Sequence, residues 1–459
     1  MTVLLDNPRS GLDGDARWTA WPSRRVMTIA AVAAVPLLLI VLQIVASYNH
    51  FEGPLHSIWE DYAGTPKSMS MPWAGLALAL VGLSWRRRFT TLAVAVVLDA
   101  VIAGVRLLLG GPLTFGNGAV ITLTGLALVA WLGWEGRDKR NALHAAALGA
   151  LLILATKVGD VWLHVTVMAG PKVLDRYVVL SDHAFGEPSW LVARALTSSA
   201  ALGPVVPAVL HWVYIELPVA AMVIAVWQLR RVASKRAPEP WPSHYLVRTF
   251  LVLGIVGPLI YVLFPVVGPM FAFAPGGHGF QIGNYWPRHV PPLDHAPARM
   301  VFDTFTPRNC VPSMHAAWST SIFLHSRRDN DGSPAPRWLR WGGAFWVLAT
   351  LVATLGFGYH YCSDLIAGVV LCLTLESVLR APERGWDGIR VALVATGAAL
   401  FSALLLSFRF LALWMAEHPV PAGIIVLALV AAYARAFYNT WFARLPDAHA
   451  TEMKDVLAR

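Results

Sequence analysis

Two short stretches of the chain carry residue types suited to phosphoryl chemistry. PRNCVPSMHAAWS at 307–319 contains His315, and TLGFGYHYCSDLIAG at 354–368 contains His360 and Asp364. His360 and Asp364 are four residues apart, so on a helix they share a face, where the carboxylate can orient the imidazole. Such a histidine can attack phosphorus, and a second one can protonate the departing oxygen. The alternative is that each histidine is an ordinary interfacial side chain with a hydrogen-bonded partner, but the combination favours a catalytic site.

The composition places these stretches in a membrane protein. Of 459 residues, 56% are hydrophobic and only 14% are charged, which excludes a soluble enzyme or a disordered scaffold. The net charge of +9 arises from short basic runs between apolar stretches, a pattern that indicates membrane orientation rather than nucleic-acid binding. The three cysteines form no CxxC metal motif, and no carboxylate cluster suggests a metal.

The apolar segments predict an all-α polytopic protein of about twelve transmembrane helices, because about 20 apolar residues cross a bilayer. The second, fourth and eighth segments are the shortest. The predicted spans are 26–47, 71–85, 89–109, 118–134, 142–165, 208–229, 246–267, 313–326, 340–358, 361–380, 391–413 and 418–437.

Basic residues occur in every second connection, which the positive-inside rule assigns to the cytoplasm. Both termini are then cytoplasmic, and the connections 166–207 and 268–312 face outward. His315 and His360 consequently reach the same outer boundary, because the chain leaves that side through one helix and returns through the next. The first apolar run is long enough to span, so we expect an uncleaved anchor in the plasma (inner) membrane.

The two stretches resemble the signatures of the type 2 phosphatidic acid phosphatase (PAP2) superfamily. Pro312 to His315 (PSMH) is similar to its PSxH motif, and Gly358 to Asp364 is similar to its HxxxD motif. The full sequence of the two motifs most resembles the inositol phosphorylceramide synthase branch and its bacterial relatives. Two upstream stretches, YVLFPVVGP at 261–269 and DHAFGEPSW at 182–190, resemble that branch's FPxxGP turn and an amphipathic helix.

The resemblance implies a six-helix catalytic core and a role for each motif residue. His360 would be the nucleophile of a phosphohistidine intermediate, Asp364 would orient it, and His315 would protonate the leaving group. Ser313 and the amides at the start of that helix would bind phosphate. No metal or other cofactor is implied. We therefore divide the chain into 1–174, a five-helix membrane region of unknown role; 175–381, the catalytic domain; and 382–459, a helix pair with a cytoplasmic tail.

The sequence departs from the superfamily pattern at two cationic positions. Thr354 replaces an arginine that often lies six residues before the nucleophile, which is usual in the synthase-like branch, and Met270 stands where a Lys or Arg is expected. Phosphate charge must still be offset. The remaining substrate-binding candidates are Tyr359 and the loop cations Arg308, Arg299 and Arg288, with Arg308 preferred; the alternative for each cation is a solvated loop or a headgroup contact.

Charged residues inside the other predicted spans form a second group of candidates. We expect internal salt bridges that join the N-terminal helices to the core, with a polar head-group pocket as the alternative. The residues are Asp99 and Arg106 in the third span, Lys157, Asp160 and His164 on one face of the fifth, and Glu216 in the sixth.

Cys310 and Cys362 flank the two motifs on the predicted outer face, where a disulfide could join the two segments. Cys372, inside the tenth span, is expected to be an inert packing residue.

Together these features predict a membrane-embedded phosphoester enzyme that faces outward. It would act on a lipid phosphate or a phospholipid head group within the bilayer, with no nucleic-acid partner. The resemblance of the motifs to the synthase branch favours head-group transfer, and the alternative is a simple lipid phosphatase. A transporter is a further alternative because of the number of spans and the intramembrane charges, but no related halves appear. A catalytically dead scaffold is disfavoured by the intact pair of histidines and aspartate.

Overall fold

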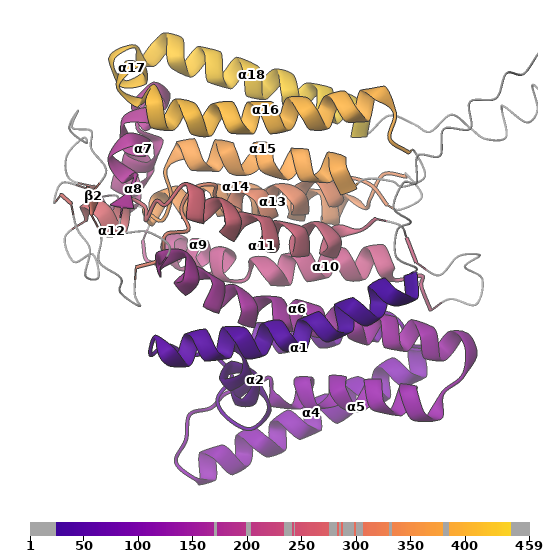
Figure 1. The fold of residues 1–459 in the computed structure, drawn as a ribbon. Coiled ribbons are helices and arrows are strands. Elements are labelled where there is room, and N and C mark those ends of the chain that lie inside the picture. Colours follow the sequence, from indigo (N-terminus) through magenta and orange to yellow (C-terminus); the bar gives the residue numbers. More distant parts are fainter. Residues whose placement is uncertain are drawn as a thin grey trace, which may run out of the picture.

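The computed structural model describes a helical bundle with one small two-stranded sheet (Figure 1). In the sheet, β1 (Lys172–Val173) pairs antiparallel with β2 (Ala298–Arg299), so that Lys172 lies opposite Arg299. The all-α prediction is therefore confirmed. The described residues are 24–168, 172–198, 203–233, 241–242, 244–274, 282–283, 286–287, 298–299, 306–329, 333–379 and 385–441.

Seven helices of the described chain are long and apolar enough to cross a membrane, which makes this an integral membrane protein. They are α4 (Trp85–Leu108), α6 (Gly136–Met168), α11 (Leu246–Leu263), α14 (Arg337–Gly356), α15 (Cys362–Leu379), α16 (Gly388–Phe410) and α18 (Pro419–Trp441). An eighth span results if α9 (Val205–Ile215) and α10 (Leu217–Leu229) count as one helix bent by 57°.

The other predicted spans correspond to α1 (Arg24–Tyr48), α3 (Ser70–Leu80), α5 (Asn117–Gly133) and α13 (Met314–His325). A helix thus stands at each of the twelve segments, but a count of twelve spans is not confirmed. The reason is length: α3 has 11 residues and α13 has 12. At about 1.5 Å per residue, neither crosses a hydrocarbon core of about 30 Å alone.

Two groups of helices pack side by side. The N-terminal α3, α4, α5 and α6 contact one another, and they join the remainder through α6 on α11 and α3 on α10. The largest apolar cluster collects side chains of α7 (Asp175–Asp182), α11, α12 (Pro269–Phe273), α13, α15, α16 and α18. Short helices complete the order: α2 (Pro54–Tyr62), the 3-10 turn η1 (His183–Phe185), α8 (Pro188–Ser198) and α17 (Ala412–Glu417).

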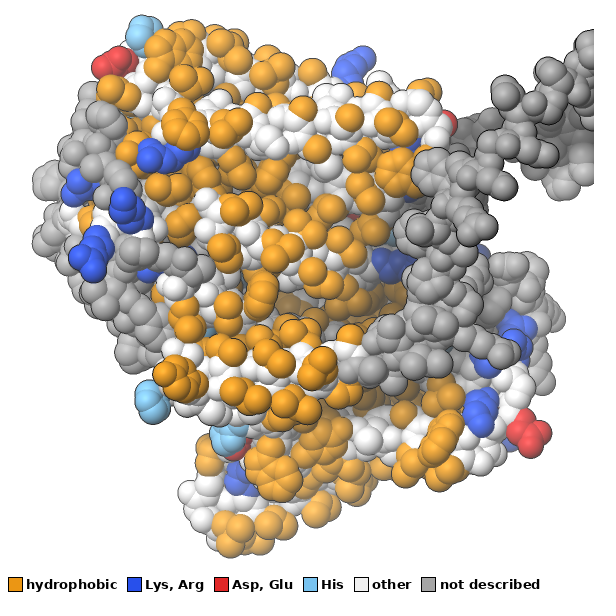
Figure 2. Space-filling model, viewed as in Figure 1, with side chains coloured by type: hydrophobic (Ala, Val, Ile, Leu, Met, Phe, Trp, Pro, Cys, Tyr) orange, Lys and Arg blue, Asp and Glu red, His pale blue; other side chains and the backbone are white. Residues whose placement is uncertain are grey.

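The outer surface of the bundle is apolar along the length of its helices. Figure 2 shows hydrophobic side chains covering the middle of one face, with Lys and Arg near its two ends. This is the distribution of a surface that meets lipid along its sides and water at its ends. Helices α13 and α15 both begin at the end of the bundle where α7, α12 and β2 lie (Figure 1).

The expectation that Asp99 and Arg106 form salt bridges to the core is wrong, because both bind groups within the N-terminal helices. Asp99 accepts the backbone N–H groups of Gly116 (2.8 Å) and Gly118 (2.6 Å) at the start of α5, which is a helix-terminus role. Arg106 instead contacts Thr114, Asn117 and the carbonyl of Gly64. Both residues therefore hold the N-terminal helices together.

The charged face of α6 turns toward the segment 51–67 rather than toward the catalytic helices. Lys157 pairs with buried Asp61 at 2.8 Å, and Asp160 lies 3.9 Å from Lys67. His164 stacks on Phe51. Lys157 is the buried partner of a buried charge, as expected of intramembrane ions. Glu216 lies between α9 and α10, at their bend.

Candidate active site

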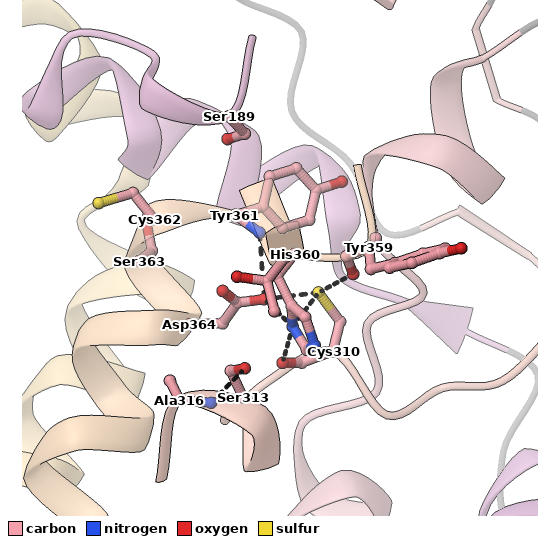
Figure 3. A network of polar contacts seen from close by, with 12 residues as sticks. Ser189, Cys310, Ser313, Ala316, Tyr359, His360, Tyr361, Cys362, Ser363 and Asp364 are labelled. Atoms are coloured by element: carbon pink, nitrogen blue, oxygen red, sulfur yellow. Dashed lines mark hydrogen bonds and ion pairs between the residues drawn. The ribbon is translucent and has the colours of Figure 1, made fainter. Parts of the chain in front are cut away.

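His360 and Asp364 meet at the start of α15. His360 precedes the helix and Asp364 lies in its first turn, so the side chain one turn on reaches back to the imidazole. His360 Nδ1 lies 3.0 Å from Asp364 Oδ2 and 3.1 Å from the carbonyl oxygen of Cys310 (Figure 3). Both side chains are buried.

These contacts fix the tautomer of His360. Both partners of Nδ1, a carboxylate and a carbonyl, are acceptors, so Nδ1 carries the proton and Nε2 keeps its lone pair. Asp364 Oδ2 also accepts the backbone N–H of Tyr361 at 3.2 Å, which fixes the carboxylate. Nε2 is then the ring nitrogen that can accept a proton or attack an electrophile.

Cys310 belongs to the same cluster. Its thiol donates to Asp364 Oδ2 at 2.6 Å and lies 3.6 Å from His360 Nδ1. Burial and the neighbouring Asp364 charge raise the pKa of the Cys310 thiol, which keeps the thiol protonated as a donor. The predicted disulfide with Cys362 is wrong: both are free thiols, and the Cys362 sulfur points away from this cluster (Figure 3).

His315 comes from α13, on which it is the second residue. Ser313 caps that helix through its side-chain oxygen, which accepts the N–H of Ala316 at 3.2 Å. The Ser313 N–H donates to the carbonyl of Asp364 at 3.0 Å, which ties the start of α13 to α15. The rings of His315 and His360 have centroids 6.1 Å apart. Attack and proton transfer each act over about 3 Å, so the two rings are close enough to act on the same phosphorus centre.

The ring of His315 is held by an aromatic partner. Tyr214, near the end of α9, stacks on it with centroids 3.9 Å apart and planes 13° from parallel. Trp318, one turn along α13, approaches its edge, and the Trp318 indole N–H donates to the carbonyl of Phe250 on α11. The bent pair of helices α9 and α10 therefore contributes a residue to the site.

Helix α7 supports the site with two buried carboxylates. Asp182 accepts the N–H groups of Cys362 (3.0 Å) and Ser363 (2.9 Å) and the hydroxyls of Ser363 and Ser189. It thus supplies acceptors to the otherwise unpaired donors at the start of α15. Burial raises the pKa of Asp182, although its hydrogen bonds oppose that shift.

Asp175, two turns earlier on α7, holds the other side of the site. It accepts the N–H of Gly268 (2.8 Å) and the hydroxyl of Tyr361 (2.9 Å), and it also contacts the N–H of Val267. Burial raises the pKa of Asp175 to about 6, although these hydrogen bonds favour the carboxylate.

The turn at 264–269 packs against residues 358–359, which directly precede His360. Gly268 has φ +99°, and a Cβ there would lie 2.4 Å from the carbonyl oxygen of Tyr359. The N–H of Met270 donates to the carbonyl of Gly358 at 2.8 Å. Glycine is therefore required at 268 both for its backbone conformation and for the close approach of the two chains.

The other predicted binding residues differ in position. Arg308 is 1% exposed, so a solvated loop residue is the wrong interpretation for it, whereas Arg299 is exposed on β2. Arg288 lies outside the described residues. Thr354 is buried: its hydroxyl donates to the carbonyl of Leu351, and its own carbonyl accepts the N–H groups that follow in the loop. Tyr359 is half-buried with its ring 5.0 Å from that of Tyr214.

Sequence reasoning missed Tyr214, Asp175, Asp182 and the hydrogen-bonding role of Cys310. Asp182 contacts a residue 181 positions away and Asp175 one 186 positions away, so local spacing carries no signal for them. For Cys310, its place five residues before His315 is a usable signal, but the sequence does not distinguish a hydrogen-bonding thiol from half of a disulfide.

Comparison with known proteins matches the segment that contains His315, His360 and Asp364 to a family model. Residues 185–376, less than half of the chain, match the family model of the PAP2 superfamily, and residues 26–165 match a domain of unknown function (DUF5933). The resemblance is thus confirmed at the level of the superfamily, and the inositol phosphorylceramide synthase branch is not. No curated protein and no solved structure matches the chain.

Proposed function

We propose that this integral membrane protein is a phosphoester enzyme that acts on lipid phosphates or phospholipid head groups through a phosphohistidine intermediate. The observation that carries the proposal is the pairing of His360, whose Nδ1 is bound by two acceptors, with His315 at a centroid distance of 6.1 Å. One imidazole would act as the nucleophile, and the other is close enough to protonate the leaving oxygen.

In the first step, Nε2 of His360 attacks phosphorus, the N–P bond forms and the bond to the lipid oxygen breaks. His315, which takes up a proton when the negatively charged phosphate binds beside it, gives that proton to the oxygen. The positive charge that develops on the His360 ring is stabilised by Asp364 and by the Cys310 carbonyl through Nδ1–H. In the second step, His315 takes a proton from water or an alcohol, which attacks phosphorus and releases His360.

The phosphate oxygens need positive charge or donors in the transition state. Arg308 is the preferred clamp, because it is buried and lies two residues before Cys310. Ser313 can donate its hydroxyl proton while its oxygen caps α13. Thr354, Tyr359, Arg299 and Arg288 remain proposed contacts, with Thr354 acting through the loop that it anchors.

A lipid substrate fits the surroundings of the site. Val205, Val209 and Trp212 on α9 are apolar and exposed, so this face of the helix would meet the acyl chains of the bilayer. Tyr214 on the same helix stacks on His315, so the helix that borders the site is also one that would contact lipid. By the positive-inside rule we place the site at the extracytoplasmic face of the plasma membrane, with both termini in the cytoplasm.

The amino-acid sequence of the motifs, with Thr354 in place of arginine, resembles that of the synthase branch, which favours head-group transfer over simple hydrolysis. The experiment is to incubate the purified protein with lipid phosphates and phospholipids, with and without alcohol acceptors. A new phosphodiester that depends on the acceptor supports transfer, whereas free phosphate alone supports a phosphatase. No reaction of either kind, in protein that is folded, contradicts the proposed function.

A further inference from the structure

Three metal-binding atom types converge on the nucleophile. Cys310 Sγ, His360 Nδ1 and Asp364 Oδ2 lie 2.6, 3.0 and 3.6 Å from one another, and all three side chains are buried (Figure 3). We propose that these residues form an inhibitory site for a thiophilic divalent cation, Zn²⁺ or Cd²⁺, and that its binding stops the phosphoryl transfer. The inhibition rests on the proposed function, but the binding itself does not.

The cluster needs little rearrangement to become a tetrahedral site. Zinc bonds of about 2.3 Å to sulfur and about 2.0–2.1 Å to nitrogen and oxygen place neighbouring ligand atoms roughly 3.3–3.6 Å apart. The Sγ–Nδ1 separation of 3.6 Å already fits, and the Nδ1–Oδ2 separation of 3.0 Å is close. The contact between thiol and carboxylate must open, which rotation of Asp364 allows. The carbonyl oxygen of Cys310, 3.1 Å from Nδ1, is available as a fourth ligand.

The charges also balance. A thiolate at Cys310 and the carboxylate of Asp364 together carry two negative charges, which cancel those of a divalent cation. A neutral complex avoids the penalty for burying net charge. On binding, the Cys310 thiol loses its proton to solvent and the sulfur–metal bond forms. The proton of His360 Nδ1 leaves that atom, and the neutral ring takes one up at Nε2, so a single proton is released per metal ion.

This change of tautomer is what would inhibit the enzyme. With the metal on Nδ1 and a proton on Nε2, His360 has no lone pair to attack phosphorus. Asp364 is also withdrawn from its role as hydrogen-bond acceptor for Nδ1–H. The cation therefore disables the nucleophile without occupying the place of the phosphate.

A second cluster of ligand types, His244, His325 and Glu376, has a different chemistry. Each histidine Nε2 lies 2.9 Å from a Glu376 oxygen. Gln228 Oε1 accepts the N–H of Leu246, so the Gln228 amide donates to His325 Nδ1 and the proton of that ring lies on Nε2. A metal on Nε2 of His325 would move the ring proton to Nδ1, where it would face the Gln228 amide, which is also a donor. This cluster is a hydrogen-bond network that joins α13 to α15 through His325 and Glu376.

The test is a titration of the purified protein with Zn²⁺ and Cd²⁺, with reversal by a chelator. Cys310→Ser keeps a hydroxyl donor toward Asp364 but removes the sulfur ligand. With each rate normalised to that variant without metal, Cys310→Ser should raise the half-inhibitory concentration at least about tenfold. Cys362→Ser is the matched control, because that thiol lies at the same helix start but outside the cluster, and it should keep wild-type sensitivity. Equal sensitivity of Cys310→Ser and wild type would overturn the proposal.

Binding is measured separately, by the ultraviolet charge-transfer absorbance of Cd²⁺ bound to thiolate. Wild type and Cys362→Ser should each bind one equivalent, and Cys310→Ser and Cys310→Ala should lose that band while eluting as monodisperse protein. A band that persists in both Cys310 variants would overturn the site. A band that depends on Cys310 in protein without phosphotransfer activity would support the site and contradict the proposed function instead.

Discussion

The carboxylate of Asp182 on α7 accepts the backbone N–H of Ser363 at 2.9 Å, in the first turn of α15. This bond links the start of the helix that carries Asp364 to a residue 181 positions earlier in the chain. Because Asp182 also accepts the N–H of Cys362, the segment directly after His360 is held from outside the helix. The position of His360, the proposed nucleophile, therefore depends on α7.

Asp182→Ala should lower kcat by about 100-fold with little change in KM, because a displacement of the nucleophile by about 1 Å has a cost of that order. Asp182→Asn should recover part of the loss, since its amide oxygen can still accept from Ser363. The measurement is steady-state kinetics of all variants. Ser189→Ala, which removes one partner of Asp182, is the control and should have a smaller effect. A change confined to KM would argue against a positioning role.

Asp175 should make stability depend on pH. Its folded-state pKa of about 6 lies above the unfolded value of about 3.9, so between these values the folded state binds more protons. Stability contributed by this group is greatest below about pH 4 and falls as pH rises to about 6, by about 3 kcal/mol. The free energy of unfolding of wild type and Asp175→Asn, measured from pH 4 to 8, should diverge in that interval. Parallel curves would contradict the assignment.

Gly268→Ala should impair the site more than the core. The added Cβ would lie 2.4 Å from the carbonyl oxygen of Tyr359, in a backbone conformation that disfavours side chains. We expect a loss of stability of about 1–3 kcal/mol and a larger relative loss of activity, because the loop that carries His360 must shift. Thermal unfolding and kcat measure the two effects. Gly254→Ala is the matched control, since its nearest contact would be 3.9 Å away.

Tyr214 should matter for the departure of the leaving group. Tyr214→Phe keeps an aromatic ring against His315, whereas Tyr214→Ala removes it and frees the imidazole. Tyr214→Ala should slow substrates with alkyl leaving groups about tenfold. It should have little effect on a p-nitrophenyl ester, whose leaving group needs no proton. Equal losses for both substrates would assign Tyr214 to binding rather than to the orientation of His315.

The sequence predicted what depends on local spacing and missed what depends on tertiary contacts. The i,i+4 relation of His360 and Asp364, and the return of the chain to the same end of the bundle, follow from helix geometry and hydropathy. The supports from Asp175 and Asp182 do not, because Tyr361 and Ser363, which they hold, lie 186 and 181 residues away in the chain. The expected salt bridges from Asp99 and Arg106 to the core are wrong for a related reason: backbone groups at helix ends and in loops compete for charged side chains.

The lengths of the predicted spans were the second limit. Hydropathy located a helix at each apolar segment, yet α3 and α13 are too short to cross a bilayer alone. After α3, the apolar residues Val81 and Leu83 belong to a turn, which hydropathy does not distinguish from helix, whereas the predicted segment 313–326 is itself hardly longer than α13. Cys310 shows a different limit: its place beside a motif is compatible with a disulfide, but its neighbour in space is Asp364.

The most direct test of the account is to trap the covalent intermediate. A labelled lipid phosphate is mixed with the enzyme, the reaction is quenched in base, and the labelled peptide is identified. The account predicts an acid-labile phosphoramidate on Nε2 of His360 that forms as fast as turnover and is absent in His360→Ala. Turnover by folded protein without such a label, or with the label on another residue, would contradict it.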